Sequence, residues 1–399
     1  MTRLALTQMG RHGEALGEAA GRAVYVPYAL PGEVVEADIA GTHAQLRAIL
    51  APSPQRIEPF CPHFGQCGGC QIQHWQADAY RGWKRGLVAT ALANQGIAAE
   101  VEALIDAQGE GRRRATLHVA RTPAGIVAGF NAARSHDIHP LDHCPILVPA
   151  LAQAPRIARR VGEIIGNCDV AFTAADNGLD VDIATKRKPP PDLAGLVHAE
   201  DLARLSLNRE PLVTRLPPEI GIGTARLRLP AGVFLQATKA GEATLAALVI
   251  ENLGKAKKVA DLFSGVGVFA LRLAAKAQVF AADGDKAATA ALAETVRRTP
   301  GLKPVEAKAR DLFREPVMAR ELAPFDAVVF DPPRAGAEAQ ARQLAKSKVK
   351  TVIAVSCDPA TFARDARILV DGGYRLMRVT PVDQFAFTAH VETVAFFKR

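Results

Sequence analysis

The chain has 399 residues, of which 49% are hydrophobic and 23% are charged, and its formal net charge is +8 at pH 7. This length exceeds what one compact core accommodates, so we expect two or three domains, and the composition excludes a disordered or fibrous protein. The excess of positive charge favours a polyanionic partner, most often nucleic acid, although solvated surface clusters would give the same balance.

The sequence predicts neither a targeting segment nor a membrane span. Its start, MTRLALTQMG, lacks a continuous apolar stretch, and no apolar run reaches the roughly 18 residues that a transmembrane helix needs. We therefore expect a cytoplasmic protein that has no membrane partner. We also expect a monomer. In that compartment the six cysteines are expected to be ligands or nucleophiles and not disulfide partners.

Residues 1–55 consist of short β segments separated by glycines. Arg22–Val26 and Glu33–Ile39 alternate between apolar and polar side chains, and Pro31-Gly32 has the composition of a turn. This pattern predicts a small β-barrel, and OB-like barrels of this size often bind oligonucleotides. A purely structural β appendage would give the same local pattern.

Residues 56–230 are expected to form a mixed α+β central domain, part of which packs with the C-terminal domain. They contain CPHFGQCGGC, in which two glycines allow a tight loop, and LDHCPIL. Four thiolates suit zinc or an iron–sulfur cluster. The spacing differs from the paired C-x2-C of most zinc ribbons, so we favour [4Fe–4S] and keep zinc as the alternative. The predicted ligands are Cys61, Cys67, Cys70 and Cys144.

Residues 231–399 alternate regularly between strands and helices. Strands are predicted at Lys258–Phe263, Gln278–Ala282, Phe325–Phe330 and Thr351–Val355, and helices at Val268–Lys276, Ala287–Arg298, Ala337–Ala345 and Pro359–Val370. This order predicts an α/β fold with a mostly parallel, doubly wound sheet. The last two segments, Tyr374–Val379 and Val391–Phe397, are predicted to form a β-hairpin.

A glycine-rich turn in VADLFSGVGVFALRLA joins a predicted strand to a helix. Gly265 and Gly267 allow the backbone to approach a ligand at the helix N-terminus. Asp283 ends the next strand, where a carboxylate can accept hydrogen bonds from both ribose hydroxyls. The turn lacks the third glycine of a dinucleotide-binding motif, so it fits S-adenosylmethionine better than NAD. An ordinary strand–turn–helix corner is the structural alternative.

Two further strand ends carry reactive groups. DPPRAG begins at Asp331, and Arg334 stands where enzymes that methylate exocyclic amines carry an aromatic residue, which argues against that reaction. Cys357, in TVIAVSCDPATFARD, precedes a predicted helix whose N-terminus is expected to lower the pKa of the thiol and make thiolate available near neutrality. A thiolate that adds to C6 of uracil activates C5 towards a methyl sulfonium.

The C5 proton must then be removed by a base. Glu392, in HVETVAFF, has apolar neighbours that are expected to bury it and raise its pKa, although a surface carboxylate would fit the same pattern. His390 is a less suitable base, because nothing in the sequence around it indicates a catalytic role.

These motifs together resemble the bacterial RNA 5-methyluridine methyltransferase family. The resemblance covers almost the whole chain: VPYALPGEVVEADI of a TRAM-type RNA-binding barrel, SPQRIEPFCPHFGQCGGCQIQH, VFLQAT, DLFSGVG, DPPRAG, SCDPATFARD and HVETV. It implies a Rossmann-like class I S-adenosylmethionine-dependent methyltransferase domain. It also implies site residues: Cys357 as nucleophile, Glu392 as base, Gln236, Phe263, Asp283 and Asp331 as cofactor contacts, and Cys61, Cys67, Cys70 and Cys144 as ligands of a [4Fe–4S] cluster.

Some positions depart from the family pattern without removing a reacting group. Val268, Thr238 and Asp358 replace frequent asparagines, Ala386 replaces a frequent proline, and Asp311 matches a further cofactor contact only loosely. Family members with both the barrel and the cluster most resemble 23S rRNA enzymes, so 23S rRNA is the expected partner. The alternatives are a tRNA uridine-C5 methyltransferase, an RNA 5-methylcytidine methyltransferase and a non-catalytic RNA-binding protein.

Overall fold

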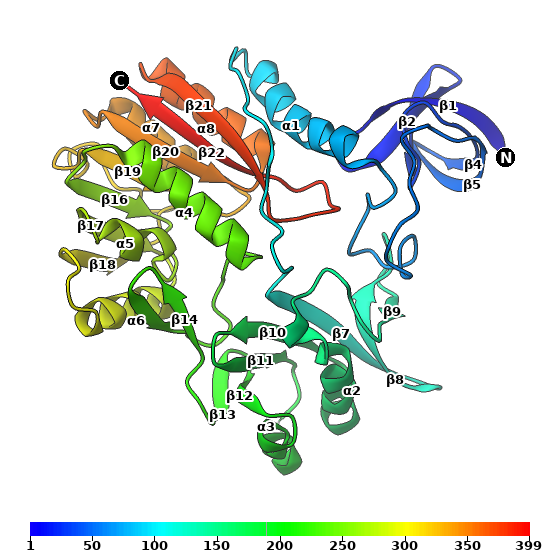
Figure 1. The fold of residues 1–399 in the computed structure, drawn as a ribbon, viewed down its shortest axis with the longest axis horizontal. Coiled ribbons are helices and arrows are strands. Elements are labelled where there is room, and N and C mark those ends of the chain that lie inside the picture. Colours follow the sequence, from blue (N-terminus) through cyan, green and yellow to red (C-terminus); the bar gives the residue numbers. More distant parts are fainter. Residues whose placement is uncertain (189) are drawn as a thin grey trace.

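The computed structural model describes residues 1–188 and 190–399. An N-terminal barrel, a central sheet and a C-terminal α/β part follow one another along the chain (Figure 1). The barrel is closed in the order β1-β2-β3-β5-β4, and side chains such as Val24 and Val26 fill its interior. Its strands are β1 (Thr2–Met9), β2 (Glu14–Ala19), β3 (Arg22–Pro27), β4 (Val34–Ala40) and β5 (His43–Ala51). The predicted small barrel is confirmed.

A buried ion pair joins the barrel to the segment that follows it. The side chain of Glu33 is fully buried and accepts hydrogen bonds from Arg56 Nε at 2.6 Å and Nη2 at 2.8 Å. It also accepts hydrogen bonds from the backbone amides of Leu30 and Ser53. Burial by itself raises the pKa of Glu33, but these hydrogen bonds outweigh it and lower the pKa, so the carboxylate stays charged.

The central part is a seven-stranded sheet in the order β13-β12-β11-β10-β7-β8-β9. Helices α2 (Ala154–Ile165) and α3 (Leu196–Ala199) cover it, with short 3-10 helices at Pro149–Leu151 and Pro191–Gly195. Its strands are β7 (Arg114–Thr122), β8 (Gly125–Asn131), β9 (Ile138–Pro140), β10 (Cys168–Ala175), β11 (Gly178–Ala184), β12 (Leu202–Leu207) and β13 (Glu210–Thr214). The expected mixed α+β character is confirmed.

The C-terminal part is an eight-stranded sheet in the order β18-β17-β16-β19-β20-β22-β21-β6, with an apolar core on each face. From β18 to β20 neighbouring strands are parallel, and β22 is antiparallel to both of its neighbours. Its main strands are β16 (Lys258–Leu262), β17 (Gln278–Asp283), β18 (Val305–Ala309), β19 (Ala327–Phe330), β20 (Thr351–Ser356), β21 (Arg375–Asp383) and β22 (Glu392–Lys398). The predicted doubly wound sheet and hairpin are confirmed.

Helices cover both faces of this sheet: α4 (Lys239–Leu253), α5 (Val268–Leu273), α6 (Lys286–Arg298), α7 (Glu338–Lys346) and α8 (Pro359–Asp371). Elements from before residue 231 complete it. β6 (Ile105–Asp106) pairs with β21, α1 (Ala77–Asn94) packs against α8, and the hairpin of β14 (Glu219–Ile222) and β15 (Ala225–Arg228) packs against α5 and α6. Sequence patterns did not predict β18 or α4.

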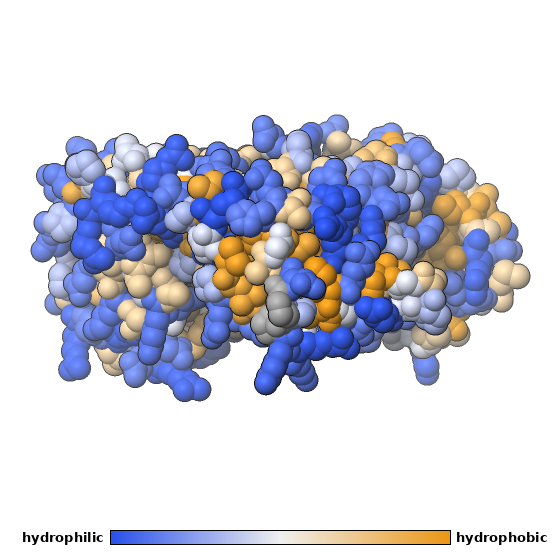
Figure 2. Space-filling model, turned by 90° about the horizontal axis from the view of Figure 1, so that it is seen from below, coloured by the Kyte–Doolittle hydropathy of each residue, from blue (hydrophilic) through white to orange (hydrophobic). Residues whose placement is uncertain are grey.

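Among the described residues, no helix combines the length and apolarity needed to cross a membrane. Seen from the side of the central sheet, the surface is largely hydrophilic, and polar side chains interrupt its apolar areas (Figure 2). Most large apolar side chains are used in the cores of the three parts.

Replacement of Arg56 by methionine is expected to destabilise the barrel by about 3–5 kcal/mol, because Glu33 would remain buried without its charge partner. Hydrogen exchange of the barrel amides measures the effect. The matched control is Arg47→Met, which removes an exposed ion pair with Asp38 and is expected to cost about 1 kcal/mol or less. Equal losses of protection in the two variants would contradict this account of the barrel.

Candidate active site

The parallel strands β16, β17, β19 and β20 bring their carboxyl ends to one edge of the C-terminal sheet. A cavity of about 520 Å³ opens at this edge. Its wall includes all six residues that the sequence singled out for catalysis or cofactor binding, namely Gln236, Phe263, Asp283, Asp331, Cys357 and Glu392. The fold therefore brings together side chains that lie far apart in the sequence.

The turn between β16 and α5 uses left-handed backbone conformations. Phe263, Gly265 and Gly267 have φ angles of +60°, +52° and +87°. A Cβ atom at Gly267 would lie 2.4 Å from Leu292 of α6, so both the backbone conformation and the packing require glycine there. Phe263 is a strained non-glycine residue in the cavity wall, where strain of this kind often accompanies function.

Asp283 supports this turn from the neighbouring strand. One of its oxygens accepts a hydrogen bond from the amide of Gly265 at 2.8 Å, and the other accepts one from the amide of Asp285 at 2.7 Å. The carboxylate therefore fixes the glycine turn and the start of α6 while it lines the cavity. Its remaining lone pairs are able to accept hydrogen bonds from ribose hydroxyls.

Gln236 connects the segment before α4 to the end of β19. Its Nε2 donates to Asp331 Oδ2 at 3.0 Å, and burial raises the pKa of Asp331 while this hydrogen bond opposes the increase. The backbone carbonyl of Gln236 accepts a hydrogen bond from Arg113, which forms a buried ion pair with Glu242 of α4. Arg113 carries no motif of its own, and its role in holding Gln236 became visible only in the structure.

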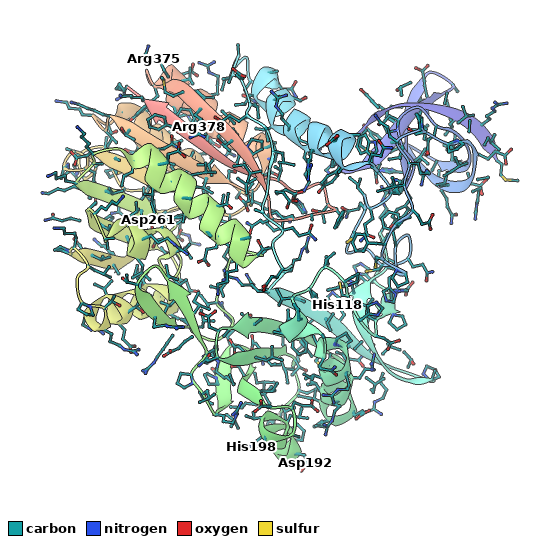
Figure 3. The ribbon with its side chains drawn as sticks, viewed as in Figure 1. His118, Asp192, His198, Asp261, Arg375 and Arg378 are labelled. Atoms are coloured by element: carbon teal, nitrogen blue, oxygen red, sulfur yellow. The ribbon has the colours of Figure 1, made fainter. Side chains whose placement is uncertain are left out.

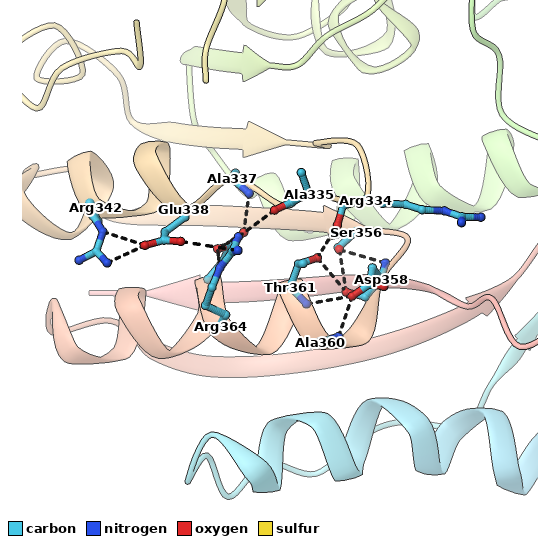
Figure 4. Close-up of polar contacts among 11 residues, drawn as sticks. Arg334, Ala335, Ala337, Glu338, Arg342, Ser356, Asp358, Ala360, Thr361 and Arg364 are labelled. Atoms are coloured by element: carbon cyan, nitrogen blue, oxygen red, sulfur yellow. Dashed lines mark hydrogen bonds and ion pairs between the residues drawn. The ribbon is translucent and has the colours of Figure 1, made fainter. Parts of the chain in front are cut away.

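The loop that carries Arg334 is tied to the helix that follows Cys357 (Figure 4). Thr361 Oγ1 donates to the carbonyl of Arg334 at 3.1 Å, and Arg364 Nη2 donates to the carbonyl of Ala335 at 3.0 Å. These hydrogen bonds fix the loop relative to α8. Arg334 consequently lines the same cavity as Cys357.

Cys357 lies between the end of β20 and the start of α8, as predicted. The expectation of a low thiol pKa was wrong for the free protein. Burial and then the carboxylates of Glu392 and Asp331 raise the pKa of Cys357 to about 12, and Arg334 only partly opposes them. The helix N-terminus does not reverse this, because the Asp358 side chain already accepts hydrogen bonds from two of the first amides of α8.

Glu392 is the first residue of β22. Ser356 of β20 pairs with Thr393 of the antiparallel strand β22, so the next position along each strand places Cys357 across from Glu392. The residue is 3% exposed, so the expected burial is confirmed. Burial and then the charge of Asp331 raise the pKa of Glu392, which is the direction expected from the sequence. A carboxylate with a raised pKa is suited to proton removal near neutral pH.

Sequence reasoning missed Gln384, because a single glutamine between two motifs gives no signal. Its Nε2 donates to Glu392 Oε1 at 2.9 Å and to Gln236 Oε1 at 2.6 Å. His390 lies at the cavity rim, where its Nε2 is 3.0 Å from Arg334 Nη2. Partial burial and the charge of Arg334 lower the pKa of His390 to about 4, so near neutral pH it is an uncharged hydrogen-bond acceptor.

Asp261 is enclosed within the C-terminal part, far from the labelled His118 and His198 of the central part (Figure 3). It is 0% exposed, and burial and then Asp331 raise its pKa well above the usual value. Asp261, Asp331 and Glu392 thus share one poorly solvated edge of the sheet. Like charges so close together favour protonation of at least one of these groups near neutral pH.

A second cavity is lined by the four cysteines predicted as ligands, Cys61, Cys67, Cys70 and Cys144. The amide of Gly68 donates to the carbonyl of Asn131 at 2.9 Å, and a Cβ atom at Gly68 would lie 2.8 Å from that oxygen, so this close approach requires glycine. Gln73 Nε2 is a buried donor without a protein partner. Within residues 1–188 and 190–399, no group of three or more His, Cys, Asp or Glu side chains is placed to hold a metal ion.

Several known proteins resemble this chain. A family model for tRNA (uracil-5-)-methyltransferase matches residues 302–399. An uncharacterized RNA methyltransferase of Brucella suis biovar 1 is 47% identical over 98% of this chain and 96% of its own length. The 23S rRNA (uracil(1939)-C(5))-methyltransferase RlmD of Halomonas elongata is 36% identical over 94% of this chain and 84% of its own length. The structure of Pyrococcus abyssi tRNA (uracil-54, C5)-methyltransferase, at 23% identity, covers 99% of this chain and 100% of its own with a TM-score of 0.78.

The parallel sheet, its glycine turn and the cavity at its carboxyl edge are those of a Rossmann-like α/β fold. The relatives add the class of reaction, because the Brucella suis and Halomonas elongata proteins are both named RNA methyltransferases and the matching family model specifies position 5 of uracil. The chain belongs to the RNA (uracil-C5)-methyltransferase family.

Replacement of Asp283 by alanine is expected to weaken binding of S-adenosylmethionine about tenfold to a hundredfold, because hydrogen bonds to a charged acceptor contribute about 1.5–3 kcal/mol. Isothermal titration calorimetry measures the dissociation constant. Asp326→Ala is the matched control, since Asp326 also accepts two backbone hydrogen bonds, from Lys257 and Lys258, but lies outside the cavity. Equal loss of affinity in both variants would contradict a direct contact.

Proposed function

We propose that the protein methylates C5 of a uridine in RNA, with Cys357 as the nucleophile and Glu392 as the base. One observation carries this proposal. A thiol and a buried carboxylate lie across from each other at the ends of β20 and β22, in the wall of the cavity that contains the glycine turn. C5 of uracil is a weak nucleophile, and addition of a thiolate at C6 makes it reactive.

The residues act in order on the bound uridine. Cys357 Sγ adds to C6, and Asp331, whose pKa burial raises, accepts the thiol proton. Arg334 faces the cavity and stabilises the negative charge that develops on the ring. Bound S-adenosylmethionine supplies an electrophilic methyl group for C5. Glu392 then removes the C5 proton, the C5=C6 double bond re-forms and the C6–S bond breaks, which frees Cys357.

The cavity suits S-adenosylmethionine as methyl donor. We assign Gln236, Phe263, Asp283 and Asp331 to the cofactor, because all four line this cavity and Asp283 has lone pairs for ribose. Asp311 lies in the same wall, which strengthens its loose match to a cofactor contact. The left-handed glycine turn leaves room for a ligand to approach the backbone.

A groove of about 1050 Å³ between the barrel and the central part extends to the active-site rim. Its walls include Tyr28 and His43 of the barrel, Arg134 of the central part, and His390. We assign this groove to the RNA, because barrels of this type bind oligonucleotides and the chain carries a net charge of +8. In this proposal the barrel of residues 1–55 binds the RNA, the central part of residues 56–230 contains the cysteine cluster, and the C-terminal part of residues 231–399 catalyses the reaction.

The proposed RNA is 23S rRNA, because the 36% identical relative is named for that substrate. Purified protein is expected to transfer labelled methyl groups to unmethylated 23S rRNA, and mass mapping is expected to locate them as 5-methyluridine. Cys357→Ala is expected to abolish transfer, whereas Cys168→Ala, which changes a buried cysteine outside the active-site cavity, retains it. Transfer to tRNA alone would refute the rRNA assignment, and full activity of Cys357→Ala would refute the nucleophile.

We further propose that Cys61, Cys67, Cys70 and Cys144 hold a [4Fe–4S] cluster. They line one cavity, and the unpartnered donor of Gln73 is available to bond sulfur. The four thiolates of such a cluster bind four different iron atoms, whereas a zinc ion would bind all four thiolates itself. Neither step of the methylation needs an electron, so the proposed role is structural.

Protein purified without oxygen is expected to be brown and to contain about four iron atoms per chain. Cys67→Ser is expected to lose both iron and colour, because one thiolate ligand is missing. Cys168→Ser is the control and is expected to keep both, since Cys168 does not line the cysteine cavity. One zinc atom in place of iron would refute the cluster and favour the alternative metal.

A further inference from the structure

Helix α1 lies far before residues 231–399 in the sequence. In the structure it nevertheless lies beside the C-terminal sheet, close to β21 and α8 (Figure 1). Two of its buried side chains converge on Asp383, at the end of β21. Lys84 Nζ donates to one carboxylate oxygen at 2.5 Å, and the Tyr80 hydroxyl donates to the other at 2.7 Å. The Lys84 side chain is 0% exposed, so its charge depends on this partner.

The same two side chains hold the turn that follows Asp383. Lys84 Nζ also donates to the carbonyl of Phe385 at 3.1 Å, and the Tyr80 hydroxyl accepts a hydrogen bond from the amide of Phe387 at 2.9 Å. Phe387 has a φ angle of +64°, a conformation that persists in a bulky residue only where its surroundings enforce it. Its carbonyl accepts two further hydrogen bonds from amides directly after the cysteine loop.

This turn carries Gln384, which is 1% exposed and donates to both Gln236 and Glu392. The side of Gln384 that faces α4 is also closely packed. A Cβ atom at Gly241 of α4 would lie 2.7 Å from both Cβ and Oε1 of Gln384, so glycine is needed there to make room. The position of the turn therefore decides whether the amide of Gln384 reaches Glu392.

We propose that Tyr80 and Lys84 are positioning residues of the active site, which hold turn 383–387 so that Gln384 donates to Glu392 and Gln236. This inference rests on the proposed role of Glu392 as base. It gives α1 a part in proton removal, although neither Tyr80 nor Lys84 lines the cavity.

The position of turn 383–387 acts on proton removal through the pKa of Glu392. Burial and then Asp331, at the end of β19, raise the pKa of Glu392, and the hydrogen bond from Gln384 lowers it. Cys357, at the end of β20, also interacts electrostatically with Glu392, and Arg334 and His390 line the same cavity. If the turn moved away, the pKa of Glu392 would rise further and the carboxyl would stay protonated to higher pH. The acid limb of the rate profile for proton removal would then move to higher pH.

Tyr80→Phe tests this inference, because it removes only the hydroxyl that joins Asp383 to Phe387. The matched control is Tyr374→Phe, which removes the hydroxyl of another buried tyrosine that donates to the carbonyl of Val349 at 2.7 Å. The measurements are kcat against pH on RNA and the fraction of enzyme in the covalent RNA adduct. In Tyr80→Phe we expect an acid limb at least about half a pH unit higher and a several-fold larger adduct fraction. Tyr374→Phe is expected to keep the wild-type profile despite a similar fall in melting temperature.

An unshifted acid limb in Tyr80→Phe, or an equal shift in both variants, would overturn the inference. Should Tyr80→Phe fail to fold, Gly241→Ala displaces Gln384 from its other side and is expected to give the same shift. Gly82→Ala in α1, where a Cβ meets nothing within 4 Å, is its control. A wild-type profile in Gly241→Ala would likewise overturn the inference.

Glu392→Gln separates this inference from the proposed function. If Glu392→Gln turns over normally, the proposed base is refuted, and the inference that rests on it fails too. If Glu392→Gln is blocked while Tyr80→Phe behaves as the wild type, only the positioning role is refuted.

Discussion

The concentration of acidic side chains at a dry edge of the C-terminal sheet is the constraint on which the rest of the site depends. Asp261 is 0% exposed and Glu392 is 3% exposed, and Asp331 acts electrostatically on both. Burying these carboxyl groups away from water and close to each other's negative charge costs free energy, which donors such as Gln236 and Gln384 offset only in part. The site therefore keeps its carboxyl groups near the point of protonation, which general acid–base chemistry requires.

The same constraint explains the behaviour of Cys357. A thiol that faces two buried carboxylates does not ionise readily, and the positive charge of Arg334 opposes this effect only in part. The nucleophile of the proposed reaction is therefore a protonated thiol near neutral pH in the free protein. A resting thiolate would be open to oxidation and alkylation, whereas a protonated thiol is much less reactive.

Residues from distant parts of the chain hold the side chains at this edge of the sheet in position. Arg113, at the start of the central part, holds the segment that carries Gln236, and α1 holds the turn that carries Gln384. The backbone just after the cysteine loop is bonded to the carbonyl of Phe387 in that same turn. Hydrogen bonds thus connect the cysteine loop to the turn beside the active site, which is consistent with a structural role for the proposed cluster.

The sequence by itself determined the barrel, the doubly wound sheet and the residues that meet in the cavity. Most of these depend on local patterns: alternation along strands, the glycine turn at Gly265 and Gly267, and reactive groups placed at strand ends, which a parallel sheet brings to one edge. Gln236 and Phe263 were implied only by the resemblance to the family. Only the tertiary structure decided the pKa of Cys357, the contribution of Gln384 and the convergence of Tyr80 and Lys84 on Asp383. Burial and charge–charge distance are properties of segments that meet in space, and no local pattern encodes them.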